Sequence, residues 1–230
     1  IYLNDEWGSW DRIRLVPRRP KESVFLRGEM MDTILADARR FFQDPLWYID
    51  RGLPHRRGYL LHGPPGNGKS TVIQALATEL GTPIYVLSLQ DPKLTDAMLA
   101  RALGRVPAGC LVVIEDFEKI RFEPDSTGVT MPGLLNCVDG PMASDGRILV
   151  ITANMLDPIP DAMLRPGRVD RRWELGLPNA ETVQAMAARF YPARGRIHNE
   201  LLATAAVREG WSVARVQQEF LIQEERDGRK

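Results

Sequence analysis

The chain has 230 residues, of which 44% are hydrophobic and 26% charged, and its 30 basic and 30 acidic residues give a formal net charge of +0. This composition is typical of a soluble globular protein with room for one large domain and one small one, and it excludes a disordered chain. The balanced charge also argues against a nucleic-acid scaffold or a polybasic membrane surface. We therefore expect no nucleic-acid partner.

The cysteines and the apolar runs bear on the compartment. Cys110 and Cys137 lie in apolar contexts without C-x-x-C spacing, which indicates reduced thiols inside a cell rather than a disulfide framework or a zinc site. No run approaches the ~20 apolar residues that span a bilayer, and the N-terminus has no signal-peptide pattern. Because the chain begins at Ile1 without a methionine, we expect a fragment. A membrane anchor would then lie only in a missing N-terminal segment.

The first residues predict two short strands, 1–3 and 12–16, around a turn at Gly8-Ser9. A lone hairpin buries too little surface to be stable, so these strands would either end a preceding domain or dock as an edge on the main one. Helical spacing then begins at Gly28 and stops at Asp44-Pro45.

Strands and helices alternate along the middle of the chain. The apolar and helical patterns predict strands at 59–61, 84–87, 110–114 and 148–151 and helices at 70–80, 94–103 and 131–138. This alternation predicts an α/β fold with a parallel sheet flanked by helices, which we assign to residues 22–178. Beyond Pro178 the spacing is helical only, at 180–190, 201–208 and 212–224, which predicts a small all-helical lid domain over residues 179–230.

A phosphate-binding pattern, G-x-x-x-x-G-K-[ST], runs from Gly63 to Ser70 between an apolar run and an amphipathic one. Such a loop turns its backbone N–H groups toward an anion at a helix N-terminus. Lys69 would reach the β- and γ-phosphates of ATP, and the Ser70 hydroxyl would hold Mg²⁺. The alternative is a turn that binds nothing. The predicted nucleotide-binding residues are Gly63, Pro64, Pro65, Gly66, Asn67, Gly68, Lys69, Ser70 and Thr71.

Polar residues end the next two buried strands. Glu115 and Asp116 follow one of them, where carboxylates can serve Mg²⁺ and the attacking water. We assign Glu115 to the metal and Asp116 to water activation, although the commoner order is Asp then Glu. Asn154 ends the next strand, and its amide could bond both the γ-phosphate and the water. The alternatives are acids that cap a strand in solvent and an asparagine that begins a turn.

The segment Arg165-Pro166-Gly167-Arg168 holds two arginines on an intervening turn. Arg165 and Arg168 could each reach a phosphate outside their own subunit as trans-acting arginine fingers. The alternative is a surface turn with salt bridges. The order of this segment after the phosphate loop, the acids and the asparagine favours the finger interpretation.

Together these residues resemble the AAA family of ring-forming ATPases. Gly63 to Ser70 matches Walker A, Val112 to Asp116 Walker B, Asn154 sensor one, and Arg165 to Arg168 the arginine-finger segment. Further stretches are similar to the Bcs-type AAA ATPases, a family named for cytochrome bc complex synthesis; they are 47–48, 51–54, 57–61, 115–116, 128–136, 139–140, 190–192 and 212–217.

The resemblance covers nearly the whole chain and implies a homo-oligomeric ring, a hexamer or heptamer, that acts on a protein client. It also implies that residues 1–21 are the C-terminal end of a Bcs-specific β-rich domain. The mitochondrial member of the family moves a folded iron–sulfur subunit across the inner membrane. This chain departs from the pattern at His62, Asn67, Ser70 and Phe117-Glu118. These departures suggest a diverged member, cytoplasmic if bacterial and otherwise facing the mitochondrial matrix from an inner-membrane anchor.

The sequence thus predicts Mg²⁺-dependent ATP hydrolysis in a ring, coupled to remodelling or translocation of a client. The segment 90–94 lacks the aromatic-apolar-Gly element with which threading unfoldases grip an extended chain, which favours a folded client. The alternative is a nucleotide-gated assembly switch with little turnover, because the reversed order shortens the catalytic acid. A DNA-directed motor is disfavoured by the charge balance.

Overall fold

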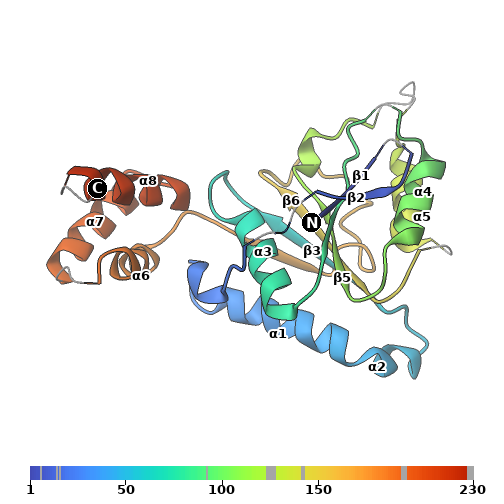
Figure 1. Ribbon diagram of the computed structural model, residues 1–230, viewed down its shortest axis with the longest axis horizontal. Coiled ribbons are helices and arrows are strands. Elements are labelled where there is room, and N and C mark those ends of the chain that lie inside the picture. The colour runs from blue at the N-terminus through green and yellow to red at the C-terminus, as the bar shows by residue number, and fades with distance from the viewer. Residues whose placement is uncertain are drawn as a thin grey trace.

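The computed structural model describes residues 1–5, 7–13, 15, 17–91, 93–122, 128–140, 143–192 and 196–226. In these ranges the chain forms an α/β core followed by three C-terminal helices, which stand to one side of the core in Figure 1. Across the same ranges, no helix combines the length and the apolar character needed to cross a membrane.

The core is built on one sheet with the strand order β2-β1-β4-β5-β6-β3-β7. Every neighbouring pair is parallel except β1 with β2, which confirms the predicted α/β parallel sheet. The strands are β1 (Tyr2–Asn4), β2 (Trp10–Arg12), β3 (Arg56–His62), β4 (Ile84–Val86), β5 (Cys110–Ile114), β6 (Arg147–Ala153) and β7 (Arg171–Glu174).

Alternation along the strands produces a core on each face of the sheet, because successive side chains of a strand point to opposite faces. Tyr59 and Leu61 of β3 pack in one cluster with α1 and α3, whereas Leu60 packs on the other face with α4 and α5. Figure 1 shows the two helix pairs on opposite sides of the strands. These helices are α1 (Met30–Gln43), α3 (Lys69–Leu80), α4 (Asp96–Arg105) and α5 (Met131–Asp139).

Three short elements connect these parts. The helix α2 (Pro45–Ile49) begins where Asp44 accepts a hydrogen bond from the backbone of Trp47. Two 3₁₀ turns, η1 (Lys21–Ser23) and η2 (Phe117–Lys119), precede α1 and follow β5. The η2 turn begins directly after Glu115 and Asp116, the two acids that the sequence predicts at the end of β5.

The N-terminal hairpin lies at one edge of this sheet, where β1 pairs in parallel with β4. Strand β2 spans Trp10–Arg12 rather than the predicted 12–16, because the Asp5 carboxylate accepts from the backbone N–H groups of Trp7 and Ser9 and closes a tight turn. Arg14 and Val16 of the predicted strand lie outside the described residues. The assignment of residues 1–21 to a preceding domain stays a prediction.

Strand β7 was not expected from the sequence. It pairs with β3 at the opposite edge of the sheet, and three of its four residues are exposed. An edge strand that buries so little carries no apolar run, so the periodicity gives no signal for it. Because β7 pairs with β3, the strand that leads into the phosphate loop is hydrogen-bonded to a neighbouring strand on both sides.

The C-terminal helices are α6 (Ala180–Phe190), α7 (Arg196–Arg208) and α8 (Val213–Arg226). They share an apolar cluster of their own that includes Met186, Ala206 and Phe220. The Asn179 side chain caps α6 by accepting from the backbone of Thr182 at 2.9 Å. Helix α7 begins five residues before the predicted 201. The domain limits 22–178 and 179–230 remain predictions.

Candidate active site

The parallel sheet brings the predicted site residues to one edge. The phosphate loop follows β3, Glu115 follows β5, and Asn154 follows β6, and these strands are neighbours in the order β5-β6-β3. Ligands bind at this carboxyl edge in open parallel sheets. The three segments, far apart in the sequence, therefore converge on one cleft.

Lys69 is the most enclosed charged group of this cluster, with 8% of its surface exposed. Its ammonium donates to the carbonyl oxygens of Gly63 at 2.6 Å and Pro64 at 3.2 Å, and to Asn154 Oδ1 at 2.8 Å. Burial lowers the pKa of Lys69, and the nearby carboxylates of Asp116 and Glu118 oppose that shift. An ammonium held across the loop in this way is placed to receive phosphate oxygens.

The two predicted metal ligands meet directly. Ser70 Oγ donates to Glu115 Oε1 at 2.9 Å. That separation also matches two adjacent ligands of an octahedral Mg²⁺, which stand about 2.9 Å apart for metal–oxygen distances of about 2.0–2.1 Å. The hydroxyl and carboxylate donors are the type that Mg²⁺ prefers. These two residues therefore fit the ion.

Asp116 lies beside this pair in an unusual conformation. It has a φ of 49°, which makes it the sole non-glycine residue with positive φ among those described. Its backbone N–H donates to Thr152 Oγ1 of β6 at 2.9 Å, and its carboxylate forms an ion pair with Lys119 at 2.6 Å. The strained backbone turns the Asp116 side chain into the same cleft as Lys69.

Asn154 is held by Glu118, a residue that the sequence singled out only as a departure from the family pattern. Glu118 Oε1 accepts from the backbone N–H of Asn154 at 3.1 Å and from Asn154 Nδ2 at 2.5 Å. This pairing leaves Asn154 Oδ1 to face Lys69. Glu118 Oε2 is buried and has no hydrogen-bond partner among the described residues.

A cleft of about 380 Å³ is lined by Lys69, Ser70, Asp116 and Asn154 and extends between the core and the lid. Its described lining adds two walls that the sequence did not predict, residues 23–26 before α1 and the first turns of α8. The backbone N–H groups of Val213 and Ala214 in α8 donate to Asn67 Oδ1 at 3.1 Å and to the Gly66 carbonyl at 2.9 Å. The phosphate loop is therefore bonded to the lid through the first two N–H groups of α8.

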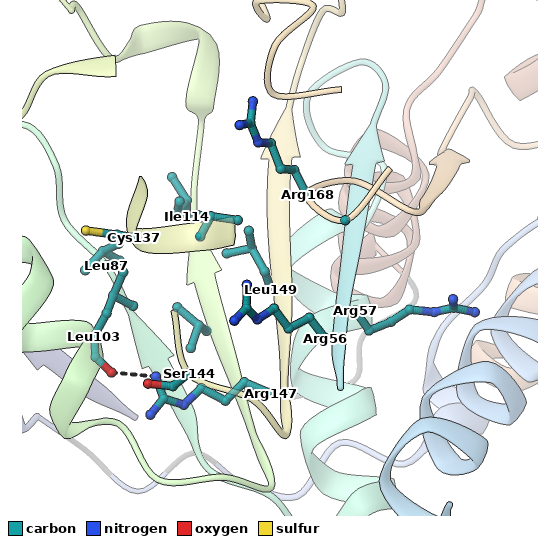
Figure 2. Close-up of a pocket in the computed structure, with 13 residues that line it drawn as sticks. Arg56, Arg57, Leu87, Leu103, Ile114, Cys137, Ser144, Arg147, Leu149 and Arg168 are labelled. Carbon is teal, nitrogen blue, oxygen red and sulfur yellow. Dashed lines mark hydrogen bonds between the residues drawn. The ribbon is translucent and has the colours of Figure 1, made fainter. Parts of the chain in front are cut away.

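The predicted arginines lie elsewhere. Of the described residues that line the cleft, none is Arg165 or Arg168. Arg168 instead lines a smaller cavity of about 50 Å³ beside α5, together with apolar side chains such as Leu87, Ile114 and Leu149. Figure 2 shows this cavity, with Arg168 at one end. The structure thus gathers all the predicted site residues except the two arginines.

The comparisons with known proteins agree with this geometry. Residues 59–177 match the model of the ATPase family associated with various cellular activities (AAA), which is just over half of the chain. The chain belongs to the AAA ATPase family. It therefore carries an AAA ATPase domain, and the predicted nucleotide-binding fold and ATPase class are confirmed.

Relatives of this AAA chain carry the name that the sequence resemblance implied. The chain is 41% identical to "Mitochondrial chaperone BCS1" of Bos taurus over 77% of its own length and 45% of that protein. It is 38% identical to the Homo sapiens chaperone of the same name over 89% and 52%. It is 39% identical to the "Probable mitochondrial chaperone bcs1" of Schizosaccharomyces pombe over 81% and 42%. These matches confirm the Bcs-type resemblance, and the AAA chain spans about half the length of these curated relatives.

Proposed function

We propose that this AAA chain hydrolyses ATP with Mg²⁺ in a homo-oligomeric ring and uses the energy to remodel or translocate a folded protein client. The observation that carries the proposal is the convergence of Lys69, Ser70, Asp116 and Asn154 on one cleft, with Glu115 hydrogen-bonded to Ser70, while both arginines lie outside the cleft. Such a site holds what binding needs, but it lacks the arginine that phosphoryl transfer uses. A second copy is the natural source of that arginine.

In this mechanism the chain contributes positioning and charge rather than covalent chemistry. Lys69 binds phosphate oxygens, and Asn154 orients the γ-phosphate and the attacking water. Asp116 accepts the proton of that water. Ser70 and Glu115 would hold Mg²⁺, which when bound neutralises phosphate charge.

The relatives bear on the client and on the ring. The relatives named above are called mitochondrial chaperones, which favours a protein client for this chain as well. A hexamer or heptamer and a matrix-facing location are the corresponding expectations, with the cytoplasm as the location if the chain is bacterial.

One observation favours the alternative, a nucleotide-gated assembly switch with little turnover. The Asp116 carboxylate is already engaged by Lys119 at 2.6 Å, so it would have to leave that ammonium before it could contact the attacking water. Measuring both phosphate release and assembly distinguishes the two functions. A switch would assemble with ATP and release almost no phosphate.

The test measures phosphate release per subunit over a wide range of protein concentration, with the oligomeric state followed by sedimentation. We expect turnover to rise with assembly, and Asp116→Asn to reduce kcat by about 10²–10³-fold while assembly with ATP persists. Assembly without phosphate release by the parent protein would establish the switch instead. A proven monomer that turns over ATP at a rate independent of concentration would refute the ring proposal.

A further inference from the structure

The η2 turn fixes Lys119 directly beside Asp116. The backbone N–H of Lys119 donates to the Asp116 carbonyl oxygen at 2.8 Å. Phe117, between them, is 2% exposed and packs in the apolar core, so the turn is anchored to the sheet. Side chains three residues apart lie one above the other in a 3₁₀ turn, which brings the Lys119 ammonium to the Asp116 carboxylate.

Both of these side chains line the nucleotide cleft. In the described part of its lining, Lys69 and Lys119 are the only basic side chains and Asp116 is the only acidic one. The triphosphate of ATP is strongly anionic, so a second ammonium in the same cleft attracts it. Lys119 was not singled out by the sequence, because it belongs to none of the local patterns there.

Lys69 and Lys119 hold their ammonium groups in different ways. Lys69 donates to the carbonyl oxygens of Gly63 and Pro64 and to Asn154 Oδ1. The Lys119 ammonium donates to one oxygen among the described residues, Asp116 Oδ2 at 2.6 Å. Because an ammonium carries three N–H donors, Lys119 keeps donors for the oxygen atoms of a ligand.

The ion pair between Lys119 and Asp116 can be exchanged for another partner. The two side chains are 58% and 39% exposed. Ion pairs at such exposure contribute little to stability, because water solvates both charges. A phosphate oxygen in the cleft offers the ammonium a charge-assisted hydrogen bond, and the flexible lysine stem allows the ammonium to move to it. The hydrogen bond to Asp116 raises the pKa of Lys119, so the group is charged when the ligand arrives.

The position of Asp116 indicates which phosphate Lys119 faces. Under the proposed function Asp116 contacts the attacking water and Asn154 orients the γ-phosphate, so both residues lie at the γ-phosphate end of the cleft. Lys119 is paired with Asp116 and therefore lies at the same end. ADP has no phosphate there.

We propose that Lys119 binds the γ-phosphate of the ATP held by its own chain. Its ammonium leaves Asp116 for a γ-phosphate oxygen, and this exchange frees the Asp116 carboxylate for the attacking water. With ADP in the cleft, Lys119 stays paired with Asp116. This inference rests on the proposed ATP hydrolysis and deepens it, because it gives one chain a means to distinguish ATP from ADP.

The test titrates dilute protein by calorimetry, in Mg²⁺, with ADP and with the non-hydrolysable β,γ-imido analogue of ATP. We expect Lys119→Ala to weaken binding of the analogue by about 10-fold, since one hydrogen bond between charged groups is lost, and to leave the affinity for ADP unchanged. Lys119→Arg keeps a cation and should retain most of the preference for the analogue. Neither variant should change Tm, because the ion pair is exposed.

An Asp116→Asn background separates direct binding from charge screening. In that background Lys119 has no carboxylate charge to neutralise at residue 116. Lys119→Ala should still weaken binding of the analogue there, because the ammonium contacts the phosphate itself. If Lys119→Ala has no effect in that background, Lys119 only screens Asp116 and the inference is overturned. Equal losses of affinity for the analogue and ADP, or no loss for either, would also overturn it.

Lys21→Ala is the matched control. Lys21 also pairs with an aspartate, Asp32, at 2.6 Å, but it is not among the described residues that line the cleft. Its substitution should leave both affinities unchanged. Failure of the proposed function has a different signature. A parent protein that prefers the analogue through Lys119 but releases no phosphate would refute hydrolysis and leave this inference standing, whereas a parent protein that binds neither nucleotide would refute both.

Discussion

Lys69 and Arg165 are both cations that ATP hydrolysis would use, but the structure holds them in opposite ways. Lys69 is 8% exposed and donates to Gly63, Pro64 and Asn154 within its own chain. Arg165 is exposed on a rigid turn. Under the proposed function, binding is complete in one chain and turnover is not. Substitutions in the two regions should therefore affect different quantities.

The largest effect on ATP binding is expected at Lys69. Lys69→Ala removes the ammonium that faces the phosphates, and charge-assisted bonds to phosphate are strong in an enclosed site. We expect the affinity for ATP to fall by about 100-fold or more, measured by titration calorimetry on dilute protein. Arg165→Ala provides the contrast and should bind ATP as the parent does. Equal losses of ATP affinity in the two variants would contradict the assignment of Lys69 to binding and of Arg165 to turnover.

A smaller effect is expected at Glu118, which orients Asn154 without facing the cleft. Glu118→Ala removes the acceptor of the Asn154 N–H and amide groups, so the amide loses its fixed orientation. We expect kcat to fall by about 10–100-fold while the affinity for ATP changes little. Glu118→Gln keeps an acceptor and should retain more activity than Glu118→Ala. Normal kcat in Glu118→Ala would mean that Asn154 does not need this support.

The smallest effect is expected at Asn67, which links the phosphate loop to the lid. Asn67→Thr shortens the side chain that accepts from the backbone of Val213, so α8 loses one cap. Losing such a cap costs about 1 kcal/mol, and we expect faster hydrogen exchange at Val213 with only a several-fold change in ATP affinity. The Ala214 N–H, which donates to the Gly66 carbonyl, is the internal reference. Unchanged exchange at Val213 would show that the bond does not hold the lid.

The phosphate-binding part of the candidate site could be predicted from the sequence because its signals are local. The pattern from Gly63 to Ser70 is one continuous stretch, and the acids and Asn154 directly follow apolar strands. Parallel pairing then brings the ends of β5, β6 and β3 together without further information. The fold class followed from the same alternation of strands and helices.

The remaining features depend on contacts between distant residues. Glu118 and Asn154 are 36 residues apart, and Arg168 and Asp139 are 29 apart. The spacing of apolar residues does not indicate such pairs, because each pair depends on how η2, α5 and the segment Arg165-Pro166-Gly167-Arg168 pack on the sheet. Strand β7 was not predicted from the sequence, because an exposed edge strand needs no apolar pattern.

The central claim is that one active site is divided between two copies of this chain, and mixing two inactive variants tests it most directly. Lys69→Ala keeps the arginine but loses the phosphate site, whereas Arg165→Ala keeps the phosphate site but loses the arginine. Each alone should be nearly inactive. A one-to-one mixture should regain turnover, because about a quarter of the interfaces in a random ring combine an intact phosphate loop with an intact Arg165. A mixture as inactive as its two components would contradict the account.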